Sequence, residues 1–204
     1  LNQKNYRKMA EMLTIAEQRN PNQPLENPFK LGDTPIQIIR EGVEAYREQE
    51  WVMIYNKAVD LIQKEKVEKA QEQIEIAILI NPRKAENYLT LAAMYLKNEN
   101  IETAISIIDQ GLKIDNSNSI LYQMKADISA KNNELETARD LYMKAIELSD
   151  GKYIPALVNK GNVLLKLGEY TSANEYYDLA FEIDPDNAIH AQLNKAINLI
   201  DNLN

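Results

Sequence analysis

Side chains that could catalyse a reaction or hold a metal are scarce in this sequence. There is no cysteine and a single histidine, His190, which excludes thiolate nucleophiles, zinc–thiolate sites and every mechanism that needs two histidines. Five carboxylates lie close together at residues 175–186, but they lack the alternating oxygen donors and central glycine of a calcium-binding loop. We interpret His190 as a surface or packing residue and the acidic cluster as a solvated helix face. We therefore expect no enzymatic activity and no metal or cofactor.

The remaining candidate chemistry is molecular recognition by lysine and asparagine. Lys97, Lys131 and Lys166 follow one another at intervals of 34 and 35 residues, and their ammonium groups would attract carboxylates. The amides of Asn159 and Asn162 can donate to and accept from a peptide backbone without reading its side chains. A lysine near the C-terminus of a helix also complements the helix dipole without any partner. The lysines can therefore be interpreted either as contacts for an acidic ligand or as residues that only stabilise their helices.

Composition and charge argue against several other classes of protein. The chain has 204 residues, of which 45% are hydrophobic, so it is long and apolar enough to bury a core. Its six glycines and seven prolines are few for the turns of an all-β fold. The net charge of −8 argues against nucleic acid as a partner. The longest apolar run, residues 76–80, is far shorter than the roughly 20 residues of a membrane-spanning helix.

Four alanines mark an internal repeat. They lie 34, 34 and 35 residues apart, and each is followed by a large residue four positions later, a small residue seven positions later and a helix-ending residue twelve positions later. The four series are Ala70, Ile74, Ala77 and Pro82; Ala104, Ile108, Gly111 and Asn116; Ala138, Tyr142, Ala145 and Asp150; and Ala173, Tyr177, Ala180 and Pro185. This spacing is that of an amphipathic helix whose small residue lets a second helix approach closely.

A second periodic segment precedes each of these predicted helices, most clearly at residues 88–95 and 157–164. Polar or glycine-containing turns separate the two segments, as at residues 98–100 and 167–169. Each unit is therefore predicted to be an antiparallel helix pair. Such a pair cannot bury both of its faces alone and must stack on its neighbours.

The spacing and residue types resemble those of the tetratricopeptide repeat family. The fourth unit carries most of the signature of that family, in Gly161, Gly168, Tyr170, Ala173, Tyr177, Ala180 and Pro185. The resemblance implies an all-α fold, a right-handed α-α superhelical solenoid of antiparallel helix pairs. Its four repeats would span residues 51–187, at about 51–84, 85–118, 119–153 and 154–187. Lys125 and Ser129 replace expected apolar residues in the third unit, where the first has Lys57 and Leu61.

The segments on either side of the repeats have their own patterns. Residues 188–204 are predicted to be a C-terminal capping helix, with Ile189, Leu193, Ala196, Ile197 and Ile200 on its apolar side. Residues 1–50 are predicted to be a divergent N-terminal helical extension, with one helix at about 4–18 and a proline-rich loop after it. A second helix is expected to start at Thr34, which would be its N-cap, with Pro35 in the first turn and Gln37 completing a capping box. Whether residues 35–62 form one bent helix or two is left open by the pattern.

The resemblance also implies where a ligand would bind. In this family the first helix of each pair lines the concave surface, and its residues off the packing face carry binding specificity. The expected groove residues are Lys97, Lys131, Lys166, Asn159, Asn162 and Asn56. We therefore expect a non-catalytic protein–protein interaction module that holds a peptide segment of a partner, either acidic or extended. The two-carboxylate clamp of some family members is incomplete, since Tyr55 and Val59 occupy positions that it would require to be lysine and asparagine.

One alternative keeps the fold and changes the mode of action. In it the chain is a self-associating assembly scaffold, a homo-oligomer formed through Trp51, the N-terminal helices or the capping helix. The first residue, Leu1, is compatible with a cleaved signal peptide and with a trimmed boundary. The composition favours no particular compartment.

Overall fold

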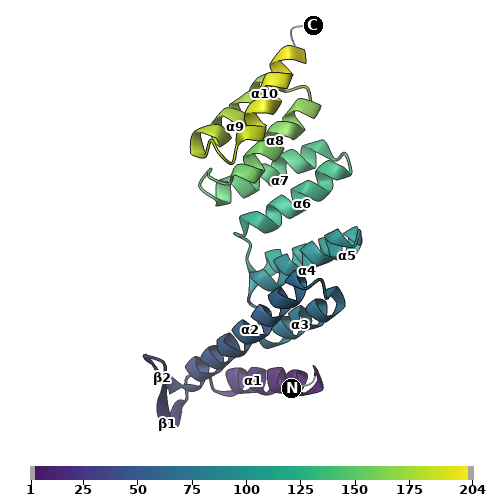
Figure 1. Cartoon of the computed structure of the whole chain (residues 1–204). Coiled ribbons are helices and arrows are strands. Elements are labelled where there is room, and N and C mark those ends of the chain that lie inside the picture. The colour runs from purple at the N-terminus through teal and green to yellow at the C-terminus, as the bar shows by residue number, and fades with distance from the viewer. Residues whose placement is uncertain (1–2, 202–204) are drawn as a thin grey trace. The chain divides into compact units, whose positions relative to one another are not determined.

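The computed structural model describes residues 3–201, and within that range the fold is almost entirely helical (Figure 1). The all-α prediction is confirmed. In order, the elements are α1 (Gln3–Arg19), β1 (Pro24–Leu31), β2 (Thr34–Ile38), α2 (Ile39–Gln63), α3 (Val67–Ile80), α4 (Ala85–Lys97), α5 (Ile101–Ile114), α6 (Ser119–Lys131), α7 (Leu135–Leu148), α8 (Ile154–Lys166), α9 (Tyr170–Ile183) and α10 (Ile189–Asp201). None of the described helices is long and apolar enough to cross a membrane.

The chain divides into two compact units, which we describe separately. Unit 1 ends at Asn100 and contains α1 to α4 with the two strands, and unit 2 begins at Ile101 and contains α5 to α10. In unit 2 the helices from α6 to α10 pack on one another in chain order. The antiparallel pairs predicted from the repeat are therefore present as α6 with α7 and α8 with α9.

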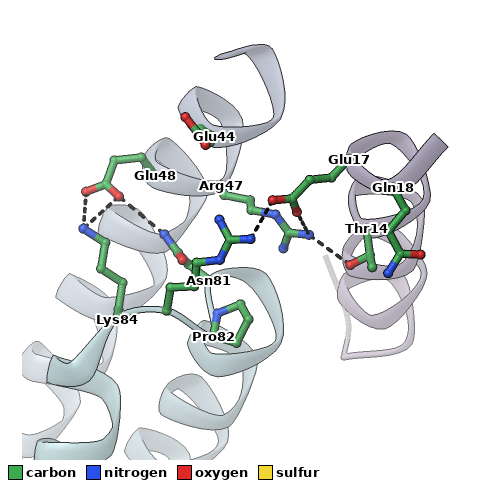
Figure 2. A pocket seen from close by; sticks show the side chains of 10 residues that line it. Thr14, Glu17, Gln18, Glu44, Arg47, Glu48, Asn81, Pro82 and Lys84 are labelled. Atoms are coloured by element: carbon green, nitrogen blue, oxygen red, sulfur yellow. Dashed lines mark hydrogen bonds and ion pairs between the residues drawn. The ribbon is translucent and has the colours of Figure 1, made fainter. Parts of the chain in front are cut away.

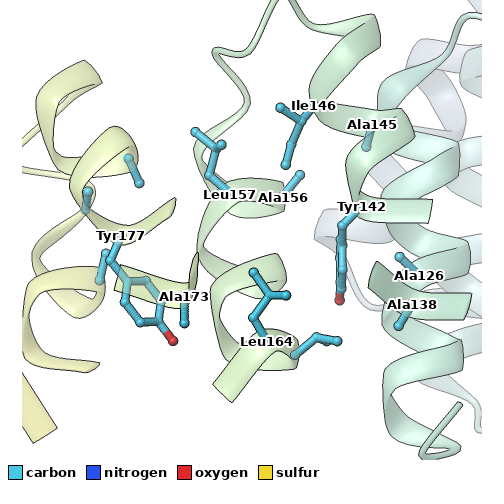
Figure 3. Close-up of a cluster of buried hydrophobic side chains, with 14 residues drawn as sticks. Ala126, Ala138, Tyr142, Ala145, Ile146, Ala156, Leu157, Leu164, Ala173 and Tyr177 are labelled. Atoms are coloured by element: carbon cyan, nitrogen blue, oxygen red, sulfur yellow. The ribbon is translucent and has the colours of Figure 1, made fainter. Parts of the chain in front are cut away.

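The core of unit 2 is built from the repeated small and aromatic residues (Figure 3). Ala138 and Ala173 are fully buried, and Tyr142 and Tyr177 fill the space beside them. Gly161 on α8 is required by this packing, because a Cβ atom there would lie 2.5 Å from Cε1 of Tyr177 on α9. The signature residues therefore set how closely the paired helices approach.

The turn inside each helix pair has the same backbone conformation. Glu65, Glu99, Asn133 and Gly168 all have positive φ, between 56° and 80°. The backbone N–H of the next residue then donates back to the carbonyl five positions earlier, at 2.9 Å, as from Glu169 to Leu164. This is the hydrogen bond that closes a helix end in a Schellman motif. The same closure occurs after residues 65, 99 and 133.

The predicted helix start at Thr34 is wrong, because residues 34–38 form β2 of a hairpin. β1 and β2 pair antiparallel, with Leu31 opposite Thr34 across a two-residue turn in which Gly32 has a φ of +60°. α2 begins at Ile39, and its capping carboxylate is Glu41, which accepts hydrogen bonds from the backbone N–H groups of Gln37 and Ile38 at 2.7 and 3.2 Å. From there α2 is one continuous helix to Gln63.

Trp51 belongs to the core of unit 1. Its ring is buried, its Nε1–H donates to Oδ1 of Asn87 at 2.8 Å, and Lys84 Nζ lies 4.4 Å from the ring centroid. It packs in one cluster with Tyr6 of α1. The prediction that Trp51 offers a self-association surface is therefore wrong.

The predicted apolar side of α10 is exposed. Ile189, Leu193 and Ile197 are 62%, 56% and 48% exposed, and Ala196 is exposed as well. The side chain of Ile200 and all of residues 202–204 lie outside the described part of the chain. The predicted orientation of this helix on the fourth repeat is therefore wrong.

The opposite side of α10 packs on unit 2 through Ala191, which is fully buried in the core of that unit, and through polar contacts. Asn194 Nδ2 donates to Oδ1 of Asn162 at 2.9 Å, and Asn198 Nδ2 donates to Oδ1 of Asn174 at 2.9 Å. Lys195 pairs with Asp178 of α9 at 2.5 Å. The buried Ala191 and these polar contacts with α8 and α9 lie on the same side of α10, a side that the pattern of large apolar residues did not predict.

Candidate functional site

Four of the six predicted groove residues line one pocket of unit 2. This pocket, which we call the groove, has a volume of about 350 Å³ and is lined by Asp127, Ala130, Lys131, Tyr142, Asn159, Asn162, Val163 and Lys166. These residues come from α6, α7 and α8. The predicted members are the two lysines and the two asparagines. The first helices of two successive pairs therefore place these side chains together.

The cations of the groove stand at its rim. Lys131 is the last residue of α6 and Lys166 the last residue of α8, and both side chains are exposed. Neither makes an ion pair within residues 3–201. The charge of Lys131 lowers the pKa of the Asp127 carboxyl in the same groove, and both lysines complement the C-terminal ends of their helices.

The floor of the groove contains a carboxylate that was not predicted from the sequence, that of Asp127. The hydroxyl of Tyr142 and the amide of Asn159 both donate to its Oδ1, the latter at 3.1 Å. Burial raises the pKa of Asp127, and these hydrogen bonds partly offset that rise. Burial also raises the pKa of Tyr142, with the hydrogen bond to Asp127 as the next cause. The repeat period could have identified Asp127, since it stands 35 residues before Asn162.

The two groove asparagines are held in place by internal hydrogen bonds. Asn162 Oδ1 accepts from the hydroxyl of Tyr177 at 2.8 Å and from Nδ2 of Asn194 at 2.9 Å, whereas its own amide nitrogen donates to no described residue. Burial raises the pKa of Tyr177 to about 12. Asn159 is fixed by its bond to Asp127. A ligand would therefore meet positioned amide groups rather than freely rotating ones.

The other two predicted groove residues belong to unit 1. Lys97 is the last residue of α4 and Asn56 lies on α2, and both are exposed. His190, on α10, is also exposed. Among the residues that the structure describes, no three histidine, cysteine or carboxylate side chains are grouped so that they could hold a metal ion.

Unit 1 contains a larger pocket of about 620 Å³ between α1, α2 and the loop that follows α3, which we call the unit 1 pocket (Figure 2). Apart from Glu44, its charged residues contact one another. Arg83 donates to Glu17 at 2.8 Å, and Lys84 donates to Glu48 at 2.9 Å. The guanidinium of Arg47 is buried, donates to the carbonyl of Ile80 and lies 3.7 Å from Glu17.

Comparison with known proteins identifies the repeat. Sequence models of the tetratricopeptide repeat match residues 85–118, 120–151 and 154–187. The human protein O-mannosyl-transferase TMTC1 is 31% identical over 108 residues, which cover 51% of this chain and 12% of that protein. The chain thus spans only a small part of this relative.

Solved structures share the fold at low sequence identity. PilF of Pseudomonas aeruginosa has a TM-score of 0.67 at 19% identity, with 76% of this chain and 70% of that chain covered. The first tetratricopeptide repeat domain of Spaghetti (RPAP3), solved with the HSP90 peptide SRMEEVD, has a TM-score of 0.53 at 16% identity, with 59% of this chain and 94% of that chain covered. These structures show the shared fold, and the three matched repeats show that the chain is a tetratricopeptide repeat protein.

Proposed function

We propose that this chain is a non-catalytic module that binds an acidic, extended peptide segment of a partner protein in the groove of unit 2. The observation that carries the proposal is the pair of cations Lys131 and Lys166, one from each of two successive first helices, on the rim of one pocket. Tetratricopeptide repeat proteins bind other proteins, and the RPAP3 domain was solved with a peptide that contains acidic residues. The proposal extends that mode of binding to the groove.

The groove has the parts that such a ligand needs. The two lysines would attract carboxylates of the peptide, and the amide NH₂ group of Asn162 would donate to a backbone carbonyl. Asp127 and Tyr142 would hold the floor rigid through their hydrogen bond, so that Asn159 keeps one orientation. Lys97 and Asn56 belong to unit 1 and are not part of this groove.

We also propose that residues 51–84 form a further repeat, the first of the four, which precedes the three matched ones. The turn at Glu65 has a positive φ at the same position as the turns of the three matched repeats. It is closed by the same backbone hydrogen bond, from the next residue to the carbonyl five positions earlier. α3 then occupies the place of a second helix, with Ala70 and Ala77 fully buried. Residues 1–50 would precede the repeats as an extension, and residues from 188 onward would follow them as a cap.

A peptide titration tests the proposed function. We would titrate the ¹⁵N-labelled chain with the peptide SRMEEVD and with its neutral counterpart SRMQQVN carrying a C-terminal amide. We expect saturable shifts at the backbone amides of Asn159, Asn162 and the ends of α6 and α8, with weaker binding of the neutral peptide. Equal affinity for the two peptides, or shifts confined to residues outside the groove, would contradict the proposal.

A second candidate function is self-association through α10. The observation that favours it is the exposed apolar stripe of Ile189, Leu193 and Ile197, spaced four residues apart on one side of the helix. Under this alternative, the molar mass measured by light scattering rises with concentration, and Leu193→Lys returns it to that of a monomer. A molar mass of one chain at all concentrations contradicts it.

A further inference from the structure

A second site in unit 2 centres on Lys160 of α8. This side chain is 3% exposed, which is unusual for a lysine, because removing an ammonium group from water is costly unless a carboxylate compensates it. Its Nζ donates to the hydroxyl of Tyr176 at 2.8 Å and to Sδ of Met143 at 3.3 Å, and it lies 4.3 Å from the centroid of the Tyr176 ring. Within the described residues no carboxylate lies within ion-pair distance of it.

The preceding repeat shows what such a lysine binds when a carboxylate is present. Lys125 of α6 stands 35 residues before Lys160, at the same position of its helix. Its Nζ pairs with Asp109 of α5 at 2.7 Å. The residue that corresponds to Asp109 one repeat later, 34 positions on, is Met143. The lysine thus recurs in the next repeat, whereas the carboxylate does not.

A pocket lies where the carboxylate is missing. It has a volume of about 290 Å³, and its lining includes Met143, Lys160, Ser172 and Tyr176. Two carboxylates, those of Asp140 and Glu169, also line it, but both face Arg139, at 3.0 and 3.7 Å. Lys160 is therefore the one cation of this lining whose carboxylate partner is absent from the described chain.

We propose that this pocket receives the carboxylate of an aspartate or glutamate side chain from a partner protein, in the position that Asp109 occupies beside Lys125. The incoming carboxylate accepts from Lys160 Nζ, and the hydroxyls of Ser172 and Tyr176 stand beside it as further donors. None of the residues that line this pocket lines the groove. The proposal is thus independent of the function proposed for the groove.

The first test uses a blocked amino acid as probe. We would titrate the full chain with N-acetyl-glutamate N-methylamide and, as a matched neutral probe, N-acetyl-glutamine N-methylamide, at constant ionic strength. The readout is the ¹³C-methyl resonance of Met143. We expect a saturable shift with the glutamate probe, its loss in Lys160→Met, and its persistence in a variant with both groove lysines replaced by methionine.

A shift that is the same for the two probes, or that survives Lys160→Met, would overturn the proposal. Loss of the shift in the groove variant alone would also overturn it, because the probe would then be bound at the groove. Failure of the groove proposal by itself leaves the Met143 shift intact, so the two failures are distinguishable.

The second test supplies the carboxylate from within the chain. Met143→Asp restores the residue type found at position 109, and Met143→Asn is its uncharged control. We expect a higher melting temperature for Met143→Asp than for Met143→Asn, no such difference in the Lys160→Met background, and no response of Met143→Asp to the glutamate probe, as followed by the backbone amide of Ser172. A melting temperature of Met143→Asp at or below that of Met143→Asn would show that Lys160 gains nothing from a carboxylate and would overturn the proposal.

Discussion

The unit 1 pocket and the groove of unit 2 are both lined by charged side chains, yet they differ in how those charges are satisfied. In the unit 1 pocket, Glu17 faces two arginines and Glu48 binds Lys84. In the groove, neither rim lysine makes an ion pair among the described residues, although the charge of Lys131 lowers the pKa of Asp127. A charged group that already makes an ion pair within the chain stabilises the fold, whereas a surface charge without such a partner can form an ion pair with a ligand. Pocket size alone would have selected the other site, since the unit 1 pocket is the larger one.

The largest expected effect is the loss of stability in Arg47→Met. Arg47 is buried and joins α2 to the end of α3 and to α1, so its removal leaves the carbonyl of Ile80 without this donor and Glu17 without one cation. We expect a decrease of about 2–3 kcal/mol in the free energy of unfolding, measured by urea denaturation, because the carbonyl of Ile80 loses a charged hydrogen-bond donor. Arg83→Met is the control, because Arg83 is exposed and its pair with Glu17 should contribute less than about 1 kcal/mol. Equal losses for the two variants would contradict the structural role of Arg47.

The next effect concerns the helix pair that supports the groove. Ala173 is fully buried between α8 and α9, so Ala173→Leu should overpack that interface and cost about 1–3 kcal/mol. Thermal melts measure the change, and Ala180→Leu should behave in the same way because Ala180 is also fully buried. If both variants melt like the parent chain, the helix register assumed for the fourth repeat is wrong.

Replacing the groove lysines should change binding without changing stability. Lys131→Met and Lys166→Met remove exposed charges, so the free energy of unfolding should stay within about 0.5 kcal/mol of the parent value. Each lysine should contribute roughly 0.2–1 kcal/mol to the binding of SRMEEVD, and the contribution should fall as salt rises. Fluorescence anisotropy at two salt concentrations measures both quantities. Unchanged affinity of the double variant would place the ligand elsewhere and remove the contrast between the two pockets.

The smallest effect is the pH dependence that arises from Asp127. Its pKa is raised in the folded chain, chiefly by burial, so its protonated form favours folding. The stabilisation is therefore fully present below the pKa of the unfolded chain and is lost as the pH rises through the folded pKa. Asp127→Asn abolishes this titration and keeps an oxygen that accepts from Tyr142 and Asn159. Relative to the parent chain, the variant should become more stable as the pH rises from about 4, the ordinary pKa of an aspartate, towards neutral, as measured by urea denaturation. A difference that is constant over this range would contradict the assignment.

Most of the repeat architecture could be predicted because its signals are local and recur. The alanines Ala138 and Ala173, each followed by a tyrosine four positions later, predicted the paired helices and the close contact between them. All four residues are buried in the structure. The hairpin could not be predicted in this way. Thr34, Pro35 and Gln37 satisfy the local pattern of a helix start, but pairing of residues 34–38 with the preceding segment decides their conformation, and that pairing is not visible in a short window.

The candidate site was predicted only in part. Lys131 and Lys166 recur with the period of the repeat, and the structure places both at the rim of one pocket. Asp127 was not predicted, although it stands one repeat before Asn162, because its role depends on the hydroxyl of Tyr142 reaching it from another helix. The exposed side of α10 was missed for a related reason, since polar contacts with α8 and α9 outweighed the hydrophobic pattern of that helix.

The left-handed turns inside the helix pairs have a consequence for engineering. Gly168 adopts this conformation without strain, but Glu65, Glu99 and Asn133 carry a Cβ there. Replacing either glutamate by glycine removes the steric strain of the turn but increases the conformational entropy of the unfolded chain. We expect the free energy of unfolding to rise by roughly 0.5 kcal/mol for each turn. None of the three positions lines the groove or the Lys160 pocket. The melting temperature of this scaffold can therefore be raised in small independent steps while its binding surfaces stay as they are.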